Sequence, residues 1–148
     1  MNNIGFIGLG AMGSVMSPLL SKAGFEVYGF DIKSTQNIKD VKVVQNLSDL
    51  YDKDIIIFML PDGKIVQKVV NELLKKNCNS LMIDMSSSDP NDTISLGAAL
   101  KKSNIEFMDA PVSGGVARAK IGELIIMVGG DENVIDKARD ILAVMGKV

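Results

Sequence analysis

Short apolar segments alternate with amphipathic segments along the whole chain. Apolar runs of strand length predict strands at Ile4 to Ile7, Glu26 to Phe30, Lys42 to Val44, Ile55 to Met59, Ser80 to Asp84, Glu106 to Met108 and Leu124 to Val128. Apolar residues at helical spacing predict helices at Met12 to Ala23, Ser48 to Tyr51, Gly63 to Lys76, Pro90 to Ser103 and Glu132 to Met145. Regular alternation of strand and helix predicts parallel βαβ units. The sequence therefore predicts an α/β fold: a doubly wound, mostly parallel sheet with helices on both faces.

Two of the predicted strands are apolar at every position. Their sequences are IIIFM, which begins at Ile55, and LIIMV, which begins at Leu124. Because a strand that is covered on both faces has no solvent side, we expect both segments to be buried on both faces.

Polar residues, prolines and glycines mark the ends of the predicted helices. Ser48 precedes the short second helix, Asp131 is placed to cap the last helix, and Pro90 marks the start of the helix before it. Gly24 lies where the first helix should end, whereas Pro18 falls inside that helix and predicts a bend or a missing hydrogen bond. The last helix has an apolar face that suits either the core or an interface with a further domain: Val134, Ile135, Ala138, Ile141, Leu142 and Met145.

Length, composition and charge narrow the class of protein. A chain of 148 residues with 47% hydrophobic and 23% charged residues suits one globular domain. Its net charge of −2 argues against a nucleic-acid partner. The apolar runs are too short for a membrane-spanning helix, so we expect no membrane insertion. The single cysteine, Cys78, excludes a disulfide framework and suits a cytoplasmic location.

The chain contains no histidine. Nucleophile systems that depend on histidine, and metal sites that use histidine ligands, are therefore excluded, and we expect no metal site. Any acid or base must be a lysine, aspartate, glutamate, tyrosine or cysteine.

A glycine-rich turn follows the first predicted strand directly and opens the first predicted helix. Gly8, Gly10 and Gly13 have the G-x-G-x-x-G spacing, within the turn Gly8-Leu9-Gly10-Ala11-Met12-Gly13. In this context Gly8 permits a tight turn, Gly10 lets a pyrophosphate approach the backbone, and Gly13 lets the helix pack against the strand. The N-terminus of the helix supplies N–H groups and partial positive charge for the phosphates. The pattern predicts a Rossmann-type dinucleotide-binding domain.

Asp31 ends the second predicted strand, eighteen residues after Gly13. A carboxylate at this place accepts hydrogen bonds from both hydroxyls of the adenosine ribose and repels a 2′-phosphate. Lys33, two residues later, can neutralise part of that charge. We therefore expect NAD as the cofactor, with NADP as an alternative.

Four motifs, in this order, make the sequence resemble the NAD(P)-binding domain of the β-hydroxyacid dehydrogenases, which are related to 6-phosphogluconate dehydrogenase. They are GFIGLGAMGSVM, FMLPDG, IDMSSSDP and DAPVSGGVARAKIGELIIMVGGDE, and the resemblance spans nearly the whole chain. The resemblance implies that Met12 faces the cofactor, that Leu60 and Pro61 line its adenosine and ribose side, and that Ser87 contacts its nicotinamide half. It also implies a substrate-carboxylate loop at Ser113, Gly114 and Gly115.

The last three of these motifs also have a purely structural interpretation. Leu60 to Gly63 has the composition of a simple turn, Ser86 to Ser88 can cap the following helix, and Ser113 to Gly115 can be a flexible connection. Asp109 and Lys120 flank the last loop, where solvated charges are the simpler interpretation.

The resemblance implies an oxidoreductase that transfers a hydride between NAD(P) and a small β-hydroxyacid or semialdehyde such as 3-hydroxyisobutyrate. In that family the catalytic lysine lies in a C-terminal helical domain that also forms the homo-oligomer, so we expect no catalytic residue within residues 1–148 and no turnover by this chain alone. Removal of that domain is expected to expose an apolar surface, with the last helix as the first candidate. Two alternatives remain open: a stand-alone NAD-binding or redox-sensing module, and a relative of the imine reductases or 6-phosphogluconate dehydrogenase.

Overall fold

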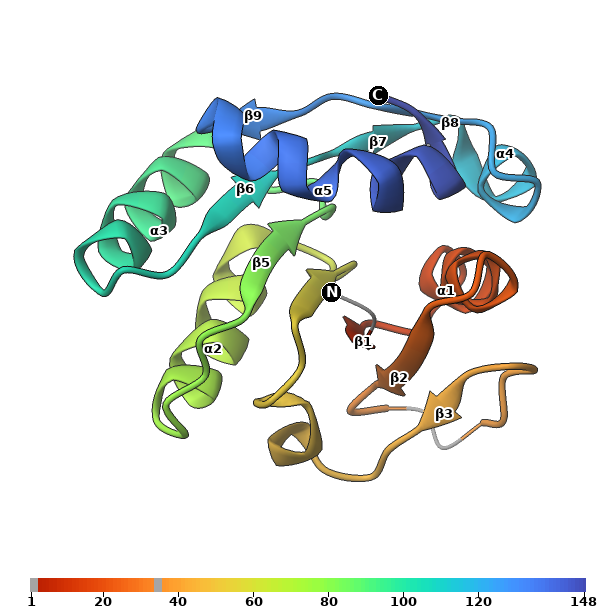
Figure 1. Cartoon of the computed structure of the whole chain (residues 1–148), viewed down its shortest axis with the longest axis horizontal. Helices are drawn as coiled ribbons and strands as arrows, with labels where there is room; N and C mark the ends of the chain where they lie inside the picture. The colour runs from red at the N-terminus through yellow and green to blue at the C-terminus, as the bar shows by residue number, and fades with distance from the viewer. Residues whose placement is uncertain (1–2, 34–35) are drawn as a thin grey trace.

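In the computed structural model, which describes residues 3–33 and 36–148, a central sheet is covered by helices on both faces (Figure 1). Its strand order is β3-β2-β1-β4-β5-β6-β9, and every neighbouring pair is parallel except β6 and β9. These strands are β1 (Asn3–Ile7), β2 (Glu26–Phe30), β3 (Lys42–Val43), β4 (Ile55–Phe58), β5 (Leu81–Asp84), β6 (Phe107–Asp109) and β9 (Gly129–Gly130). The order reverses between β1 and β4, which creates the crevice where doubly wound sheets bind ligands.

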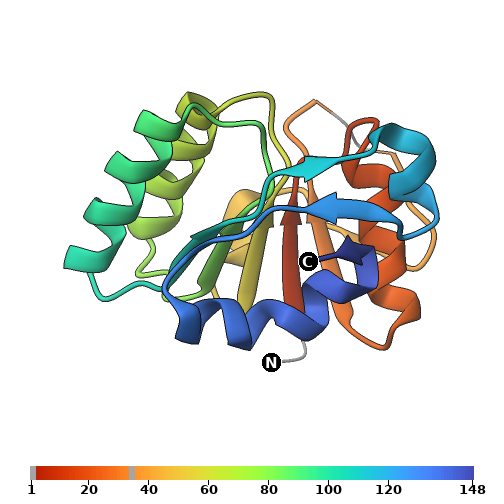
Figure 2. The same cartoon turned by 90° about the horizontal axis from the view of Figure 1, so that it is seen from above.

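The helices divide between the two faces of the sheet, as Figure 2 shows from above. On one face α1 (Gly13–Lys22) and α5 (Glu132–Met145) enclose a core that includes Phe6, Ile57 and Ile83. On the other face α2 (Gly63–Leu74) and α3 (Pro90–Lys102) enclose a second core that includes Ile56, Phe58 and Met82. Because both faces are covered, every residue of β4 is buried, which confirms the prediction for the first four residues of IIIFM; Met59, just after the strand, is half-buried.

A second, three-stranded sheet corrects the prediction for LIIMV. It has the order β10-β8-β7 and is formed by β7 (Val112–Ser113), β8 (Leu124–Ile126) and β10 (Gly146–Lys147). Leu124 and Ile126 are buried, but Ile125 is 48% exposed and Met127, just beyond the strand, is 51% exposed. The prediction was wrong because this sheet lies outside the parallel sheet, so only one of its faces packs on the core.

The remaining helices are short. The predicted second helix is a 3₁₀ helix at Leu47–Leu50, in which Ser48 lies inside rather than before the first residue. The helix α4 (Gly115–Lys120) was not predicted.

α1 continues through Pro18, and Gly24 follows its end with φ +101°. No helix in the described parts of the chain is long and apolar enough to cross a membrane.

The last helix belongs to the core. In α5 the residues Val134, Ala138, Ile141, Leu142 and Met145 are buried, so the expected exposed surface does not lie there. Asp131 occupies the N-cap position, but its side chain makes no capping hydrogen bond; its carboxylate lies 3.9 Å from the Lys101 ammonium instead.

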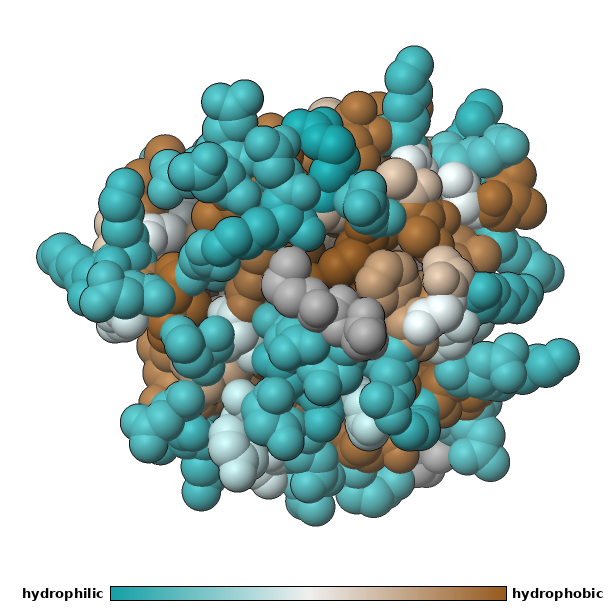
Figure 3. Space-filling model, viewed as in Figure 1, coloured by the Kyte–Doolittle hydropathy of each residue, from teal (hydrophilic) through white to brown (hydrophobic). Residues whose placement is uncertain are grey.

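The exposed apolar side chains lie elsewhere. Ile125 lies in β8 and Met127 just after it, and Val116 and Ile121 lie in and just after α4. We call these four residues the outer apolar patch. The other large apolar side chains that are exposed among the described residues are Ile32, Tyr51, Ile94 and Val148. Figure 3 shows a mostly hydrophilic face with hydrophobic residues exposed over α4.

Candidate functional site

A cavity of about 720 Å³ opens at the carboxyl ends of β1, β2 and β4, at the crevice where the strand order reverses. The structure brings together most of the residues that the sequence predicts for the cofactor. Those that line the cavity are Gly8, Gly10, Ala11, Met12, Gly13, Asp31, Leu60 and Pro61. Leu9 and Ser87 lie outside its lining.

The three glycines of the turn have three different environments. Gly8 has φ +102°, and an ideal Cβ on it would lie 2.1 Å from the carbonyl oxygen of Met59. An ideal Cβ on Gly13 would lie 1.8 Å from the carbonyl oxygen of Gly8, because α1 begins against the end of β1. An ideal Cβ on Gly10 would meet no atom within 4 Å. Gly8 and Gly13 are therefore required by the fold, whereas the bare backbone at Gly10 leaves space on the cavity side.

Asp31 holds the glycine-rich turn in place. Its Oδ2 accepts a hydrogen bond from the Leu9 N–H at 2.8 Å, and its Oδ1 accepts one from the Lys33 N–H at 2.8 Å. The Leu9 side chain is buried in the core, and its carbonyl oxygen accepts a hydrogen bond from Gln36 Nε2 at 3.2 Å. Leu9 therefore fixes the turn, while the Asp31 carboxylate lies at the cavity wall.

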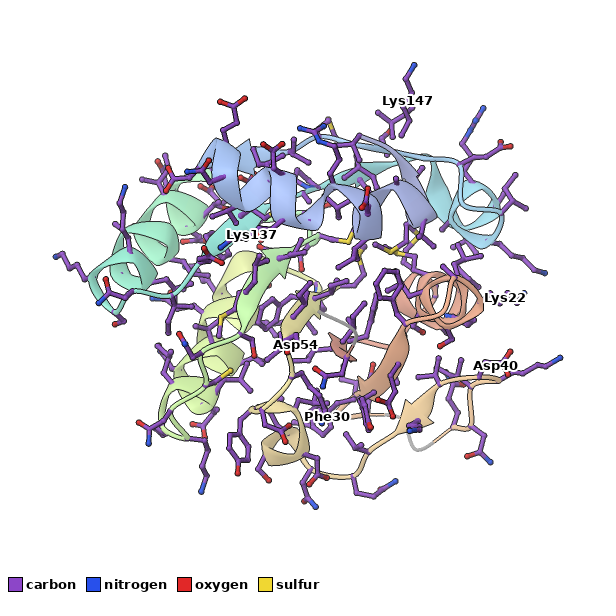
Figure 4. The ribbon with its side chains drawn as sticks, viewed as in Figure 1. Lys22, Phe30, Asp40, Asp54, Lys137 and Lys147 are labelled. Atoms are coloured by element: carbon purple, nitrogen blue, oxygen red, sulfur yellow. The ribbon has the colours of Figure 1, made fainter. Side chains whose placement is uncertain are left out.

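The walls of the cavity include residues that the sequence analysis missed. Ile65 and Val69 come from α2, while Phe30 and Ile32 come from the end of β2, where Figure 4 labels Phe30. Ile32 is 88% exposed, which is unusual for a large apolar side chain. The position of Ile32 directly after Asp31 could have indicated that it lines the cavity. No sequence pattern indicates this for Ile65 and Val69, because their distance from the glycine-rich turn depends on how α2 packs.

The loops after β4 and β5 are ordered by aspartates. Asp62 caps α2 by accepting hydrogen bonds from the N–H groups of Lys64 and Ile65, both at 3.0 Å. Asp89 caps α3 by accepting one from the Asn91 N–H at 2.8 Å. The alternative that Ser86 to Ser88 cap α3 is therefore wrong. Ser87 is exposed between buried Ser86 and half-buried Ser88.

The predicted substrate loop forms the turn between β7 and α4. Ser113 ends β7 and is exposed, opposite Ile125 of the outer apolar patch in the neighbouring strand. Gly114 and Gly115 follow with φ +134° and +68°, which favour glycine, and Gly115 begins α4. The loop lies outside the cavity lining.

Two acids end neighbouring strands on the same face of the sheet, since Asp84 of β5 and Asp109 of β6 are partners in the parallel register. Burial raises the pKa of the Asp109 carboxyl, and the charge of Asp84 adds to this increase. Lys120 is exposed. Within the residues that the structure describes, no group of three or more acids and cysteines could hold a metal ion.

The chemistry of the cavity fits a dinucleotide. Apolar walls suit a flat aromatic ring, Asp31 suits a pair of hydroxyl groups, and the open backbone at Gly10 beside the N-terminus of α1 suits a pyrophosphate.

Comparisons with known proteins agree with this geometry. The family model described as the NAD binding domain of 6-phosphogluconate dehydrogenase matches residues 3–148. The 2-(hydroxymethyl)glutarate dehydrogenase of Eubacterium barkeri is 38% identical over 97% of this chain and 51% of its own length. The mitochondrial 3-hydroxyisobutyrate dehydrogenase of Rattus norvegicus is 40% identical over 97% of this chain and 45% of its own length.

Solved structures show the same fold. The 3-hydroxyisobutyrate dehydrogenase of Mycobacterium tuberculosis, solved with L-serine, has a TM-score of 0.91 and 36% identity over 99% of this chain and 52% of its own. An imine reductase of Myxococcus stipitatus in complex with NADP⁺ has a TM-score of 0.86 at 17% identity over 97% of this chain and 52% of its own, and shows the fold alone. The chain spans about half the length of the curated relatives that it matches.

Proposed function

The chain belongs to the family of the NAD binding domain of 6-phosphogluconate dehydrogenase, and from this premise we propose that it is the cofactor-binding half of a two-domain oxidoreductase. The proposed reaction transfers a hydride between NAD(P) and a small β-hydroxyacid or semialdehyde such as 3-hydroxyisobutyrate. The observation that carries the proposal is the cavity at the strand reversal, with the open backbone of Gly10 and the carboxylate of Asp31 on its wall. The similarity to dehydrogenases named for such substrates supports it.

The residues of the cavity have separate roles in this proposal. The pyrophosphate lies over Gly10 at the N-terminus of α1, beside Ala11 and Met12. Asp31 accepts hydrogen bonds from the hydroxyls of the adenosine ribose, and Leu60 and Pro61 cover the ribose. The adenine ring packs between apolar side chains of β2 and α2. When bound, the cofactor supplies the hydride acceptor or donor, and this chain orients it and shields it from water.

The same residues favour NAD over NADP. A 2′-phosphate on the adenosine ribose would meet the negative charge of Asp31 and displace the ribose hydroxyls from it. Lys33 lies on the same cavity wall and weakens this repulsion. We therefore propose a preference for NAD, with NADP as a weaker ligand.

The substrate end is proposed at the loop of Ser113, Gly114 and Gly115, where backbone N–H groups and the serine hydroxyl would bind a carboxylate. Ser113 shares a face of the small sheet with Ile125 of the outer apolar patch. We propose that a C-terminal helical domain covers this face and supplies the catalytic lysine and the contacts of a homo-oligomer. The relatives' greater length supports such a domain. In this arrangement residues 1–148 contain no catalytic residue.

A second candidate is a stand-alone NAD-binding or redox-sensing module. The observation in its favour is that the residues proposed for the adenosine half of the cofactor, Gly10, Asp31, Leu60 and Pro61, line one cavity. The imine reductases share the fold, at 16% to 20% identity, which does not indicate a shared reaction.

We propose a cytoplasmic location because one buried cysteine suits a reducing compartment, although several relatives are named as mitochondrial.

Binding measurements test the proposal directly. Isothermal titration of the purified chain with NADH, NADPH and AMP should show binding of all three, with NADH tighter than NADPH. Failure of both NADH and AMP to bind at millimolar concentration would contradict the proposed function. We expect this chain alone to bind NADH but not to oxidise any β-hydroxyacid when NAD⁺ is supplied. Turnover would place a catalytic group within residues 1–148 and refute the proposed division of labour.

A further inference from the structure

A buried carboxylate lies at the end of β5, outside the cavity lining. Asp84 is only 2% exposed. Its Oδ1 accepts a hydrogen bond from the Ser86 N–H at 2.9 Å, and its Oδ2 accepts one from the Ser88 hydroxyl at 2.7 Å. We call these three residues the Asp84 network. Both carboxylate oxygens therefore hold polar groups of the loop between β5 and α3.

The Asp84 network also holds the neighbouring loop between β4 and α2. Ser86 Oγ accepts a hydrogen bond from the Leu60 N–H at 2.9 Å. At the other end of that loop, an ideal Cβ on Gly63 would lie 3.0 Å from Ser88 Cβ, so the start of α2 packs directly on Ser88. The two loops are thus joined at two points, one by a hydrogen bond and one by close packing.

The position of this junction points to the second half of a dinucleotide. β4 and β5 are parallel and in register, with Phe58 beside Asp84, so their following loops lie at the same edge of the sheet. Leu60 lines the adenosine cavity, and the loop after β5 is one strand farther along this edge. A dinucleotide that crosses the strand reversal extends in this direction. Ser87 is exposed in this loop, between the two anchored serines.

Stability alone is a weak explanation for a carboxylate at this place. An ionised group is costly to bury, and an apolar set of similar shape can be as stable as a buried polar network. What Asp84 provides, and an apolar residue would not, is a fixed orientation of the loop around Ser87.

We propose that Asp84 is a positioning residue for the nicotinamide half of the cofactor. It does not touch the cofactor; through Ser86 and Ser88 it sets the loop that carries Ser87, relative to the adenosine cavity at Leu60. This inference rests on the proposed function, and AMP, which lacks the nicotinamide half, separates the two.

The test compares NADH with AMP for each variant of the purified chain. Asp84→Ala should raise the dissociation constant for NADH about tenfold, equivalent to the loss of about one hydrogen bond, and raise the AMP constant much less. Asp84→Asn should restore most of the NADH affinity, because its amide has a carbonyl oxygen for the Ser86 N–H and an NH₂ for the Ser88 oxygen. Asp89→Asn is the matched control: it changes an exposed acid in the same loop, and asparagine is an equally good N-cap.

Each outcome of this test either supports or overturns the proposed role of Asp84. A raised ratio of the NADH to the AMP constant in Asp84→Ala, restored by Asp84→Asn and unchanged in Asp89→Asn, supports the proposal. Equal losses for NADH and AMP, or no loss for either, overturn it and leave Asp84 a purely structural residue. If Asp84→Ala does not fold, Ser88→Ala, which removes one arm of the network, is judged by the same ratio. If the unmodified chain binds neither ligand, the proposed function itself fails.

Discussion

Replacement of each glycine of the turn by alanine should separate the fold from ligand binding. The cost at Gly13 follows from the contacts: the new Cβ would lie 1.8 Å from the Gly8 carbonyl oxygen and 3.1 Å from the Phe6 ring. Because α1 must move away from β1 to relieve this overlap, we expect a loss of about 1–3 kcal/mol in the free energy of unfolding. For a chain of this size each 1 kcal/mol lowers Tm by about 2–4 °C.

Gly8→Ala should be at least as destabilising, because it adds a strained φ to an overlap with backbone atoms of Met59. Gly10→Ala should differ from both. Its Cβ meets nothing in the free protein, so Tm should be unchanged. In the complex the methyl group occupies the approach of the pyrophosphate. Loss of one hydrogen bond to a charged group is worth about 1.5–3 kcal/mol, so the NADH dissociation constant should rise about tenfold to a hundredfold.

Two assays on the same three variants decide the matter. Thermal unfolding without ligand, followed by circular dichroism, measures the structural cost, and isothermal titration with NADH measures the cost to binding. If Gly10→Ala lowers Tm as much as Gly13→Ala does, Gly10 is required by the fold and not only by the ligand. If Gly10→Ala binds NADH as tightly as the unmodified chain, the pyrophosphate does not lie over Gly10.

Further predictions concern two acids and the activity of the chain. Asp31→Asn keeps an oxygen for the Leu9 N–H but removes the charge, whose repulsion of a phosphate about 4 Å away is worth about 1 kcal/mol or more. The ratio of NADPH to NADH affinity should therefore rise about tenfold, and an unchanged ratio would place Asp31 away from the ribose. Burial raises the pKa of Asp109 in the folded protein, so the folded state binds its proton more tightly than the unfolded state does, and stability falls as pH rises through this range. Asp109→Asn should therefore raise Tm at pH 7 and lose this advantage below the unfolded-state pKa of about 3.9; an equal effect at both pH values would show that ionisation is not the cause. Purified residues 1–148 should show no oxidation of 3-hydroxyisobutyrate with NAD⁺, as measured by NADH absorbance.

Local patterns determined most of the parallel sheet. The apolar runs at β1, β4 and β5 and the helical spacing of α5 place these elements to within a residue or two, because hydrophobic periodicity and caps act over one or two turns of chain. The glycine-rich turn was also readable. A Cβ on Gly13 would meet the carbonyl oxygen of Gly8, five residues earlier, so this requirement arises within the strand–turn–helix unit itself. A Cβ on Gly8 would meet Met59, which follows the neighbouring strand β4.

The sequence did not indicate whether a strand is buried on one face or on both faces. IIIFM and LIIMV are equally apolar, yet β4 is covered by helices on both sides and β8 on one side only. The difference depends on which layer each strand joins, and that is decided by pairing: β8 pairs with β7 and β10, outside the main sheet.

The sequence by itself therefore determined the order of the long helices and of the parallel strands, the glycine turn and the acid at the end of β2, but not α4, β7, β9 or β10. Only the tertiary structure decided which side chains converge on them. Ile65 reaches the cavity from α2, and Asp84 organises two loops through Ser86, Ser88 and the Leu60 N–H, which lies 26 residues from Ser86. Such contacts join residues far apart in the chain, and no local periodicity encodes them, because they exist only once the strands have paired and the helices have packed.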